Sequence, residues 1–298
     1  MHFEPGNLNT KKFLKIIAVV TVFLAAIILG TIYYATAVTM NDFDFFSRAV
    51  LHPFVFPKEA YDIEPVPGIK KVSLFIPCAD GAKMHALYFK KPGADKLVIV
   101  NHGAGGNLLG RVYIAQSAAL AGASTLLYDY RGYAQSTGKF NLDTILEDGL
   151  TAYDYANKKL GYPANKIIEC GESIGSAVAS QTAVKRPCAG VLMLCGVTRL
   201  PAAVRKIFPI FWIFPDAIFA KNKINNLETI QNVHAPILFI HGKLDAQVPY
   251  QGSEEMFAKA SKPKQLVLLP DCGHDDLGRK DAEQFQKAMD DFLSESKN

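Results

Sequence analysis

The sequence predicts an α/β protein: a mostly parallel sheet of about eight strands, with helices on both faces and one N-terminal transmembrane helix before it. Three observations predict this class. Residues 16–38 form one long apolar run. After residue 66, short apolar runs alternate with longer amphipathic stretches, as in repeated strand–helix units. Several apolar runs are continuous rather than alternating, which is typical of strands buried on both faces of a sheet.

The composition is that of a globular protein. Of the 298 residues, 49% are hydrophobic and 20% are charged, which excludes a disordered chain. The net charge of +4 comes with no clustered basic face, so we expect no nucleic-acid partner. The five cysteines show neither a disulfide framework nor zinc-ligand spacing. We therefore expect no metal, no cofactor and no obligate protein partner, and a single disulfide stays open.

The N-terminal region directs the chain to a membrane. The run 16–38 carries no charge and exceeds the roughly 20 residues that cross the hydrocarbon core as a helix. Three lysines precede it. They predict that residues 1–15 are a short cytoplasmic N-terminus and that 16–38 are a single-pass anchor. The catalytic domain then lies on the outer (periplasmic, extracellular or lumenal) side. The alternative is secretion after cleavage near Ala37, which lies in a small-x-small pattern.

Two further segments complete the domain organisation. Residues 39–65 are a connector rich in phenylalanine and interrupted by prolines; it is either a packed linker or a segment at the membrane interface. Residues 66–298 form the α/β domain. Its first two strands flank Asp80-Gly81, a hairpin signal. The expected strands are 72–77, 83–89, 97–100, 124–128, 166–170, 190–195, 237–240 and 265–269, and the expected helices are 109–121, 142–160, 173–185, 252–260 and 281–294.

A reactive serine is predicted where one strand turns into a helix. Gly171-Glu172-Ser173-Ile174-Gly175 matches G-x-S-x-G between the expected strand 166–170 and the following helix. The glycines permit a tight turn that raises the serine hydroxyl above the sheet. A helix N-cap serine after a glycine turn would give the same pattern. The strand–turn–helix context favours the nucleophile.

A serine nucleophile needs a base and an orienting acid. His274 follows the last apolar strand, and a histidine in a loop above the sheet can reach Ser173. Asp245 follows the strand 237–240, which gives the chain order Ser, Asp, His expected for this architecture. Asp129 precedes the serine, so we expect it to have a role in loop structure. Two further aspartates near the histidine could assist it, namely Asp271 and Asp275.

Acyl transfer also needs hydrogen-bond donors for the developing oxyanion. The backbone N–H of Ile174, directly after the serine, is one expected donor. The glycine-rich loop 101–107 follows the strand 97–100, and there we assign the second donor to Ala104. A glycine-rich loop after a strand can instead hold phosphate. The chain has no nucleotide-binding fingerprint, which disfavours that interpretation.

These motifs resemble those of the α/β-hydrolase-fold serine hydrolases. They are closest to the membrane-anchored branch that includes the Bem46-like and ABHD13-like proteins. The resemblance implies hydrolysis of an ester or thioester, with Ser173 as nucleophile, Asp245 as acid, His274 as base, and Ala104 and Ile174 as oxyanion donors. The chain departs mildly from the family pattern at two positions. It has Ala134 where members commonly have Gly, and Ser176 where they commonly have Gly or Ala. The matching segments are residues 80–85, 101–103, 129–133, 171–175, 241–245 and 273–274.

The stretch 197–230 is where such folds insert a lid, and it contains Phe208–Phe219, the most aromatic stretch of the chain. Phe211, Trp212 and Phe214 either form an acyl-binding wall above the serine or pack as a short helix on the sheet. With an anchor in the same chain, we expect a small-molecule acyl ester or lipid-like substrate. The alternatives are a peptidase of the serine aminopeptidase type, for which Glu172 is a faint candidate for binding a free N-terminus, and a non-catalytic membrane-anchored binding protein.

Overall fold

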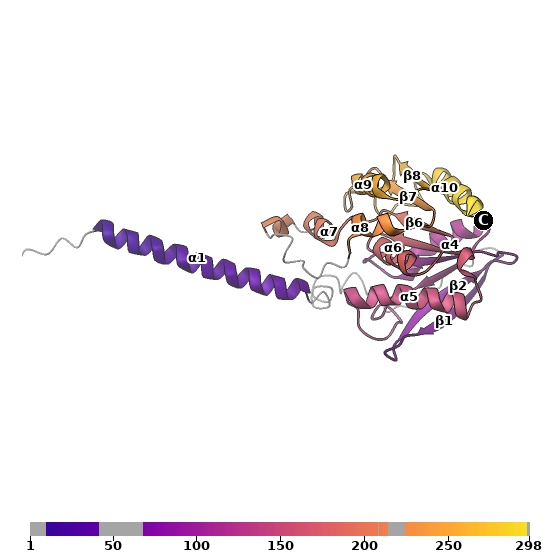
Figure 1. The fold of residues 1–298 in the computed structure, drawn as a ribbon, viewed down its shortest axis with the longest axis horizontal. Helices are drawn as coiled ribbons and strands as arrows, with labels where there is room; N and C mark the ends of the chain where they lie inside the picture. Colours follow the sequence, from indigo (N-terminus) through magenta and orange to yellow (C-terminus); the bar gives the residue numbers. More distant parts are fainter. Residues whose placement is uncertain (1–9, 42–67, 208, 214–223, 297–298) are drawn as a thin grey trace, which may run out of the picture.

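The computed structural model describes residues 10–41, 68–207, 209–213 and 224–296. Strands and helices alternate along the domain, as the sequence predicts (Figure 1). The strands are β1 (Lys70–Pro77), β2 (Lys83–Lys90), β3 (Leu97–Asn101), β4 (Ser124–Tyr128), β5 (Ile167–Glu172), β6 (Gly190–Leu194), β7 (Ile237–Gly242) and β8 (Lys264–Leu269). The α-helices are α1 (Thr10–Asn41), α4 (Val112–Leu120), α5 (Leu142–Lys158), α6 (Gly175–Lys185), α7 (Leu200–Ile207), α8 (Asn226–Thr229), α9 (Gln251–Lys259) and α10 (Ala282–Glu295). The short 3-10 helices are η2 (Leu108–Arg111), η3 (Ala164–Lys166), η4 (Pro209–Ile213) and η6 (Ile230–Asn232).

The eight strands form one sheet in the order β1-β2-β4-β3-β5-β6-β7-β8. β2 pairs antiparallel with β1 and β4, whereas all pairs from β4 to β8 are parallel. β3 lies between β4 and β5, so the chain leaves β3 toward one side and returns to its other side. Ligands of open α/β sheets bind outside the carboxyl ends of the strands at such a reversal. The register pairs Asn101 with Gly171, which brings the loop after β3 beside Ser173.

Helices cover both faces of the sheet because successive strand residues point to opposite sides. In β3, Leu97 and Ile99 pack in one core cluster with residues of α5 and α6. Val98 and Val100 pack on the other face with residues of α4 and α10. Because both faces of the sheet are buried, the sequences of these strands are continuous apolar runs.

The N-terminal helix and several element boundaries differ from the predicted ranges. α1 spans Thr10–Asn41 and is longer than the predicted 16–38. Its Ile17–Tyr34 stretch is long and apolar enough to cross a membrane, and its side chains are exposed; a signal sequence has the same properties. Most of the predicted connector 39–65 lies outside the described residues. α6 begins at Gly175 rather than at residue 173, because Ser173 has a φ of 54° and leaves the right-handed helical region.

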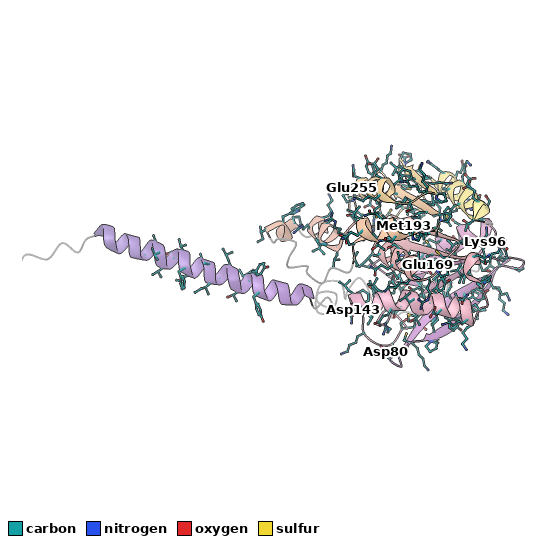
Figure 2. All side chains as sticks on the ribbon, in the orientation of Figure 1. Asp80, Lys96, Asp143, Glu169, Met193 and Glu255 are labelled. Atoms are coloured by element: carbon teal, nitrogen blue, oxygen red, sulfur yellow. The ribbon has the colours of Figure 1, made fainter. Side chains whose placement is uncertain are left out.

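One carboxyl group is buried within the sheet. Glu169 on β5 is fully buried within the sheet layer (Figure 2). Its Oε2 accepts a hydrogen bond from Asn101 Nδ2 at 2.8 Å, and its Oε1 has no partner among the described residues. Burial raises the pKa of Glu169 to about 8, although the bond from Asn101 opposes the shift. The group is therefore predominantly protonated at neutral pH.

Glu169→Gln is expected to remove a pH-dependent loss of stability. The folded state holds the Glu169 proton more tightly than the unfolded chain does, so the stabilising effect is complete at acidic pH and is lost as the pH rises through about 8. Between the two pKa values the wild type should lose about 1.4 kcal/mol per pH unit relative to the variant. Urea unfolding of both proteins from pH 5 to pH 9 measures this difference. Parallel curves would show that Glu169 does not titrate there.

Candidate active site

The turn between β5 and α6 presents Ser173 above the sheet. Ser173 has a φ of 54°, and its N–H donates to the Leu194 carbonyl at 2.9 Å. Both flanking glycines are required by close backbone contacts. A Cβ at Gly171 would lie 2.3 Å from the Gly175 carbonyl oxygen, and one at Gly175 would lie 2.0 Å from the Asn101 carbonyl oxygen. The predicted nucleophile therefore lies on a strained strand–turn–helix elbow.

The predicted base and acid lie in hydrogen-bond contact. His274 Nδ1 lies 2.6 Å from Asp245 Oδ2, although 29 positions separate the residues. Because the carboxylate can only accept, Nδ1 carries the proton and Nε2 keeps its lone pair. Burial lowers the pKa of His274, but the hydrogen bond and charge of Asp245 outweigh this and raise it above its ordinary value. Asp129, by contrast, accepts from the Leu108 N–H at 2.7 Å, which is the expected loop role.

Asp245 is held by more donors than the sequence indicates. Its Oδ1 accepts from the N–H groups of Gln247 (2.9 Å) and Val248 (2.7 Å). His241 Nε2 lies 3.1 Å from Asp245 Oδ2 and 2.9 Å from the Val248 carbonyl oxygen. Burial opposes ionisation, yet the hydrogen bonds from His241 and His274 hold the pKa of Asp245 well below its usual value. The role of His241 was not predicted from the sequence, where its place four residues before the acid is the available signal.

One cluster has the composition of a metal site. Cys195, His241 and Asp245 offer ligand atoms that lie within 4.8 Å of one another. However, His241 Nε2 faces two acceptors and must carry the proton, and its Nδ1 is 2.7 Å from Ser253 Oγ. Neither ring nitrogen has a lone pair available for a metal without rearrangement. The closeness of these side chains is therefore explained by the hydrogen bonds that hold Asp245 in place, rather than by metal binding. All five cysteines are free thiols.

The residues of the two predicted oxyanion donors, Ala104 and Ile174, line the same cavity as Ser173. The Ile174 N–H belongs to the N-terminal end of α6, where helix N–H groups lack intrahelical acceptors. Ala104 lies in the loop after β3, and its carbonyl accepts from Tyr133 Oη at 3.2 Å. His102 Nδ1 lies 2.7 Å from the Gly103 carbonyl oxygen. Burial lowers the pKa of His102 to about 4, so the ring is neutral and acts as a structural donor.

A buried ion pair joins this loop to the elbow. Arg111, at the end of η2, donates from Nε to Glu172 Oε2 at 2.6 Å and from Nη2 to Glu172 Oε1 at 3.0 Å. Its third nitrogen, Nη1, donates to the Gly105 carbonyl at 2.7 Å. Both side chains are largely buried. Arg111 therefore fixes the distance between the loop 101–107, called the oxyanion loop below, and Glu172, the residue before Ser173. The sequence did not reveal this role.

Ser173 and His274 line one cavity of about 810 Å³. Ala104, Arg111 and Ile174 also line it. The remaining wall is mainly apolar and comes from α7 and neighbouring loops, including Val197, Leu200, Ala203, Val204, Ala246 and Val248.

Of the predicted aromatic wall, the structure describes the side chain of Trp212 alone. Trp212, on η4, is 70% exposed and lines a neighbouring cavity of about 600 Å³ rather than the one that holds Ser173. The side chain of Phe211 and all of Phe214 lie outside the described residues. Among the described residues, aliphatic side chains of α7 therefore provide the apolar wall.

The start and end of the predicted insertion 197–230 are tied to the elbow. The buried Asn226 donates to the Val197 carbonyl at 2.8 Å and to Ser176 Oγ at 2.9 Å. Ser176 Oγ in turn donates to the Ser173 carbonyl at 2.6 Å. The hydroxyl that departs from the family pattern thus links the insertion to the nucleophile turn.

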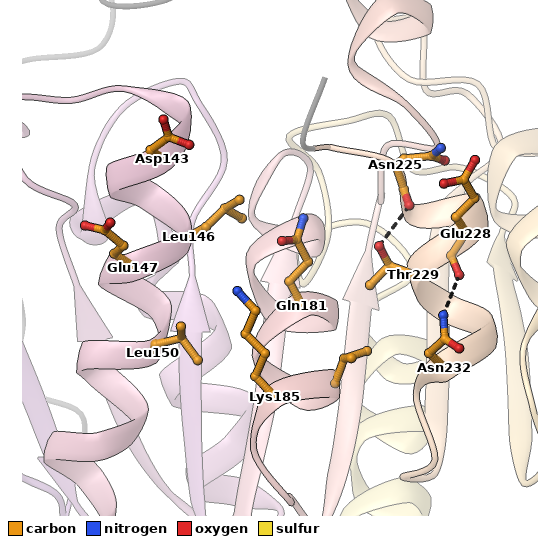
Figure 3. A pocket seen from close by; sticks show the side chains of 11 residues that line it. Asp143, Leu146, Glu147, Leu150, Gln181, Lys185, Asn225, Glu228, Thr229 and Asn232 are labelled. Carbon is orange, nitrogen blue, oxygen red and sulfur yellow. Dashed lines mark hydrogen bonds between the residues drawn. The ribbon is translucent and has the colours of Figure 1, made fainter. Parts of the chain in front are cut away.

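A second hollow, of about 780 Å³, lies between α5, α6 and α8 (Figure 3). Asp143, Glu147 and Glu228 give it acidic character, and Lys185 is the cation in its lining. Its described lining contains neither serine nor histidine, and Glu147 is already paired with Arg131 at 2.8 Å. The reactive groups therefore belong to the cavity at the strand ends.

Comparison with known sequences supports the class that the fold and site define. The family model described as serine aminopeptidase, S33, matches residues 92–231, and that of TAP-like protein matches residues 219–298. The uncharacterised Mycobacterium tuberculosis protein Rv2307c is 30% identical over 239 residues, covering 78% of this chain and 84% of its own length. Escherichia coli YfhR is 22% identical over 281 residues, covering 93% and 94% of the two chains.

Solved structures share the fold. The Pyrococcus furiosus esterase Pf2001 superimposes with a TM-score of 0.70 at 17% identity, covering 82% of this chain and 98% of that chain. Est1E from Butyrivibrio proteoclasticus, solved with ferulic acid, gives a TM-score of 0.62 at 24% identity, covering 75% and 98%. The chain belongs to the α/β-hydrolase family.

Proposed function

We propose that this protein is a serine hydrolase that cleaves carboxylic ester or thioester bonds of acyl substrates. The observation that carries the proposal is one cavity lined by Ser173 on a strained elbow and by His274, whose Nδ1 is bound to the ionised Asp245. The apolar α7 wall suits an acyl chain.

The proposed reaction is a two-step acyl transfer. Ser173 Oγ attacks the carbonyl carbon while His274 Nε2 takes the hydroxyl proton, and Asp245 stabilises the imidazolium. The Ala104 and Ile174 N–H groups donate to the oxyanion. His274 then protonates the leaving group, and water, activated by the same base, releases the acid and regenerates Ser173.

The arrangement favours an esterase over an aminopeptidase. A substrate with a free N-terminus needs an available carboxylate. Glu172, the carboxylate nearest Ser173 in sequence, already receives two hydrogen bonds from Arg111. The negative charge of Glu172 is therefore neutralised within the wall of the cavity. The other carboxylate in the described lining, Asp275, accepts a hydrogen bond from Gln247 Nε2 at 3.1 Å.

We also propose that α1 is a single-pass anchor with a cytoplasmic N-terminus, as in the Bem46-like and ABHD13-like branch. The exposed apolar stretch Ile17–Tyr34 and the lysines before it support this topology.

A chain-length series tests the substrate class. We expect kcat/KM for p-nitrophenyl esters to rise from acetyl to medium and long acyl chains, with Ser173→Ala as the blank. An amino-acid p-nitroanilide should be turned over far more slowly. Equal or better hydrolysis of the acetyl ester would contradict an acyl-chain site, and faster hydrolysis of the anilide would favour the peptidase.

The proposed base predicts the acid limb of the pH profile. Neutral His274 is the active form, so kcat/KM should fall as the pH drops through a pKa above the ordinary histidine value of about 6.5. Asp245→Asn removes the main charge that raises this pKa, so the limb should move to lower pH while the rate drops about 10⁴-fold. Rate measurements on both proteins from pH 5 to pH 9 test this. An unmoved limb in the variant would show that another group titrates.

A further inference from the structure

Outside α1, few large apolar side chains are exposed among the described residues, and two of them are neighbours. Trp212 and Ile213, on η4, are 70% and 67% exposed. Leu244, which is 61% exposed, follows β7 at the same carboxyl edge of the sheet. Adjacent exposed apolar residues are unfavourable in water and mark surfaces that contact another apolar phase.

This surface lies at the entrance to the catalytic cavity. α7 and η4 follow β6 in the chain and project from the carboxyl edge of the sheet (Figure 1). Leu200 and Val204 of α7 line the cavity that holds Ser173. Lys206, on the last turn of α7, lines both this cavity and the neighbouring one that includes Trp212. If α7 and η4 contact a surface, the opening of the cavity that holds Ser173 therefore faces that surface.

The charged residues of α7 and η4, the two described elements next to Trp212, are basic. The last turn of α7 carries Arg205 and Lys206, and the Arg205 guanidinium lies 5.5 Å from the centroid of the Trp212 ring. The sequences of α7 and η4 contain no acidic residue. Glu255 contributes an acidic group across the neighbouring cavity. Tryptophan flanked by arginine and lysine is the composition favoured where a protein meets a bilayer with anionic headgroups.

We propose that α7 and η4 dock on the surface of an anionic lipid bilayer, with Trp212 and Ile213 inserted at the headgroup level. Arg205 and Lys206 contact the lipid phosphates. The same chain carries α1, whose length and apolar sequence suit a bilayer, so lipid is the occupant that the molecule indicates. In this orientation the cavity opens toward the membrane. Docking uses neither Ser173 nor His274, and it stands or falls independently of the proposed reaction.

Trp212 is the single tryptophan of the chain, so its emission reports on this surface directly. The test uses the full-length Ser173→Ala protein in vesicles of phosphatidylcholine with and without phosphatidylglycerol, made with brominated or ordinary acyl chains. We expect brominated lipid to quench Trp212, several-fold more strongly with phosphatidylglycerol, and salt to weaken the effect. Emission that stays solvent-like, open to iodide and unquenched in both vesicles would overturn the proposal.

Two double variants separate the docking surface from net charge. Arg205→Gln with Lys206→Gln should reduce quenching several-fold in phosphatidylglycerol vesicles. Lys159→Gln with Lys185→Gln removes the same charge at the C-terminal ends of α5 and α6, toward the opposite edge, and should leave quenching unchanged. Equal losses in both would attribute the effect to net charge and contradict a docking surface. A blue shift that instead requires high protein concentration without lipid would identify a second copy as the occupant.

Discussion

Replacing Ser173 with alanine is expected to abolish ester hydrolysis, with kcat falling about 10⁴-fold or more. The loss should be this large because the variant removes the only group in the proposed mechanism that forms a bond to the substrate. The variant still binds substrate at the apolar wall, and it keeps the Ala104 and Ile174 donors. Its residual turnover should therefore be that of an oxyanion site without a nucleophile. Steady-state hydrolysis of the best p-nitrophenyl ester measures the effect.

Two controls accompany this variant: a measurement of its own stability, and the removal of a different serine. Ser173→Ala keeps the backbone strain at position 173, so its urea midpoint should match that of the wild type. Ser117→Ala, on α4 and away from the cavity, should keep wild-type activity. Hydrolysis by Ser173→Ala above about a tenth of the wild-type rate would show that the serine is not the nucleophile.

Replacing Arg111 with leucine is expected to damage both stability and activity. The change leaves Glu172, which is 4% exposed, as a buried carboxylate without its cation. Removing one partner of a buried ion pair costs about 3–5 kcal/mol of folding free energy. The Gly105 carbonyl also loses its donor, so the oxyanion loop is no longer fixed relative to Ser173. Urea unfolding and kcat/KM, measured where the variant is folded, report the two effects.

A second substitution separates these effects. Adding Glu172→Gln removes the unpaired charge and should recover most of the stability, whereas kcat should stay low because nothing replaces the bond to Gly105. Arg111→Lys keeps a positive charge but lacks the planar fork, so it should recover activity only in part. Full activity in the Arg111→Leu, Glu172→Gln protein would show that Arg111 acts only through Glu172 and does not position the loop.

The places of the three predicted site residues were easier to predict from the sequence than the residues that hold them. Ser173, Asp245 and His274 each follow an apolar strand, and the carboxyl ends of parallel strands share one edge, so their proximity was predictable. The start of α6 was not, because the positive φ of Ser173 delays the helix by two residues.

The supporting residues depend on contacts between distant parts of the chain. Arg111 meets Glu172 across 61 positions, and no local pattern indicates that pairing. The aromatic stretch predicts either a wall above the serine or a short helix packed on the sheet, yet Trp212 is exposed. Which face a short helix presents to a cavity depends on packing rather than on composition, and this could not be read from the residues alone.

Labelling with a fluorophosphonate probe, followed by mass spectrometry of the modified peptide, tests whether Ser173 is an activated nucleophile. The probe reacts with an activated serine and needs no knowledge of the substrate. We expect one adduct, on Ser173, that is absent from Ser173→Ala and strongly reduced in His274→Ala. An unlabelled but folded wild-type protein, or an adduct on another residue, would contradict this expectation.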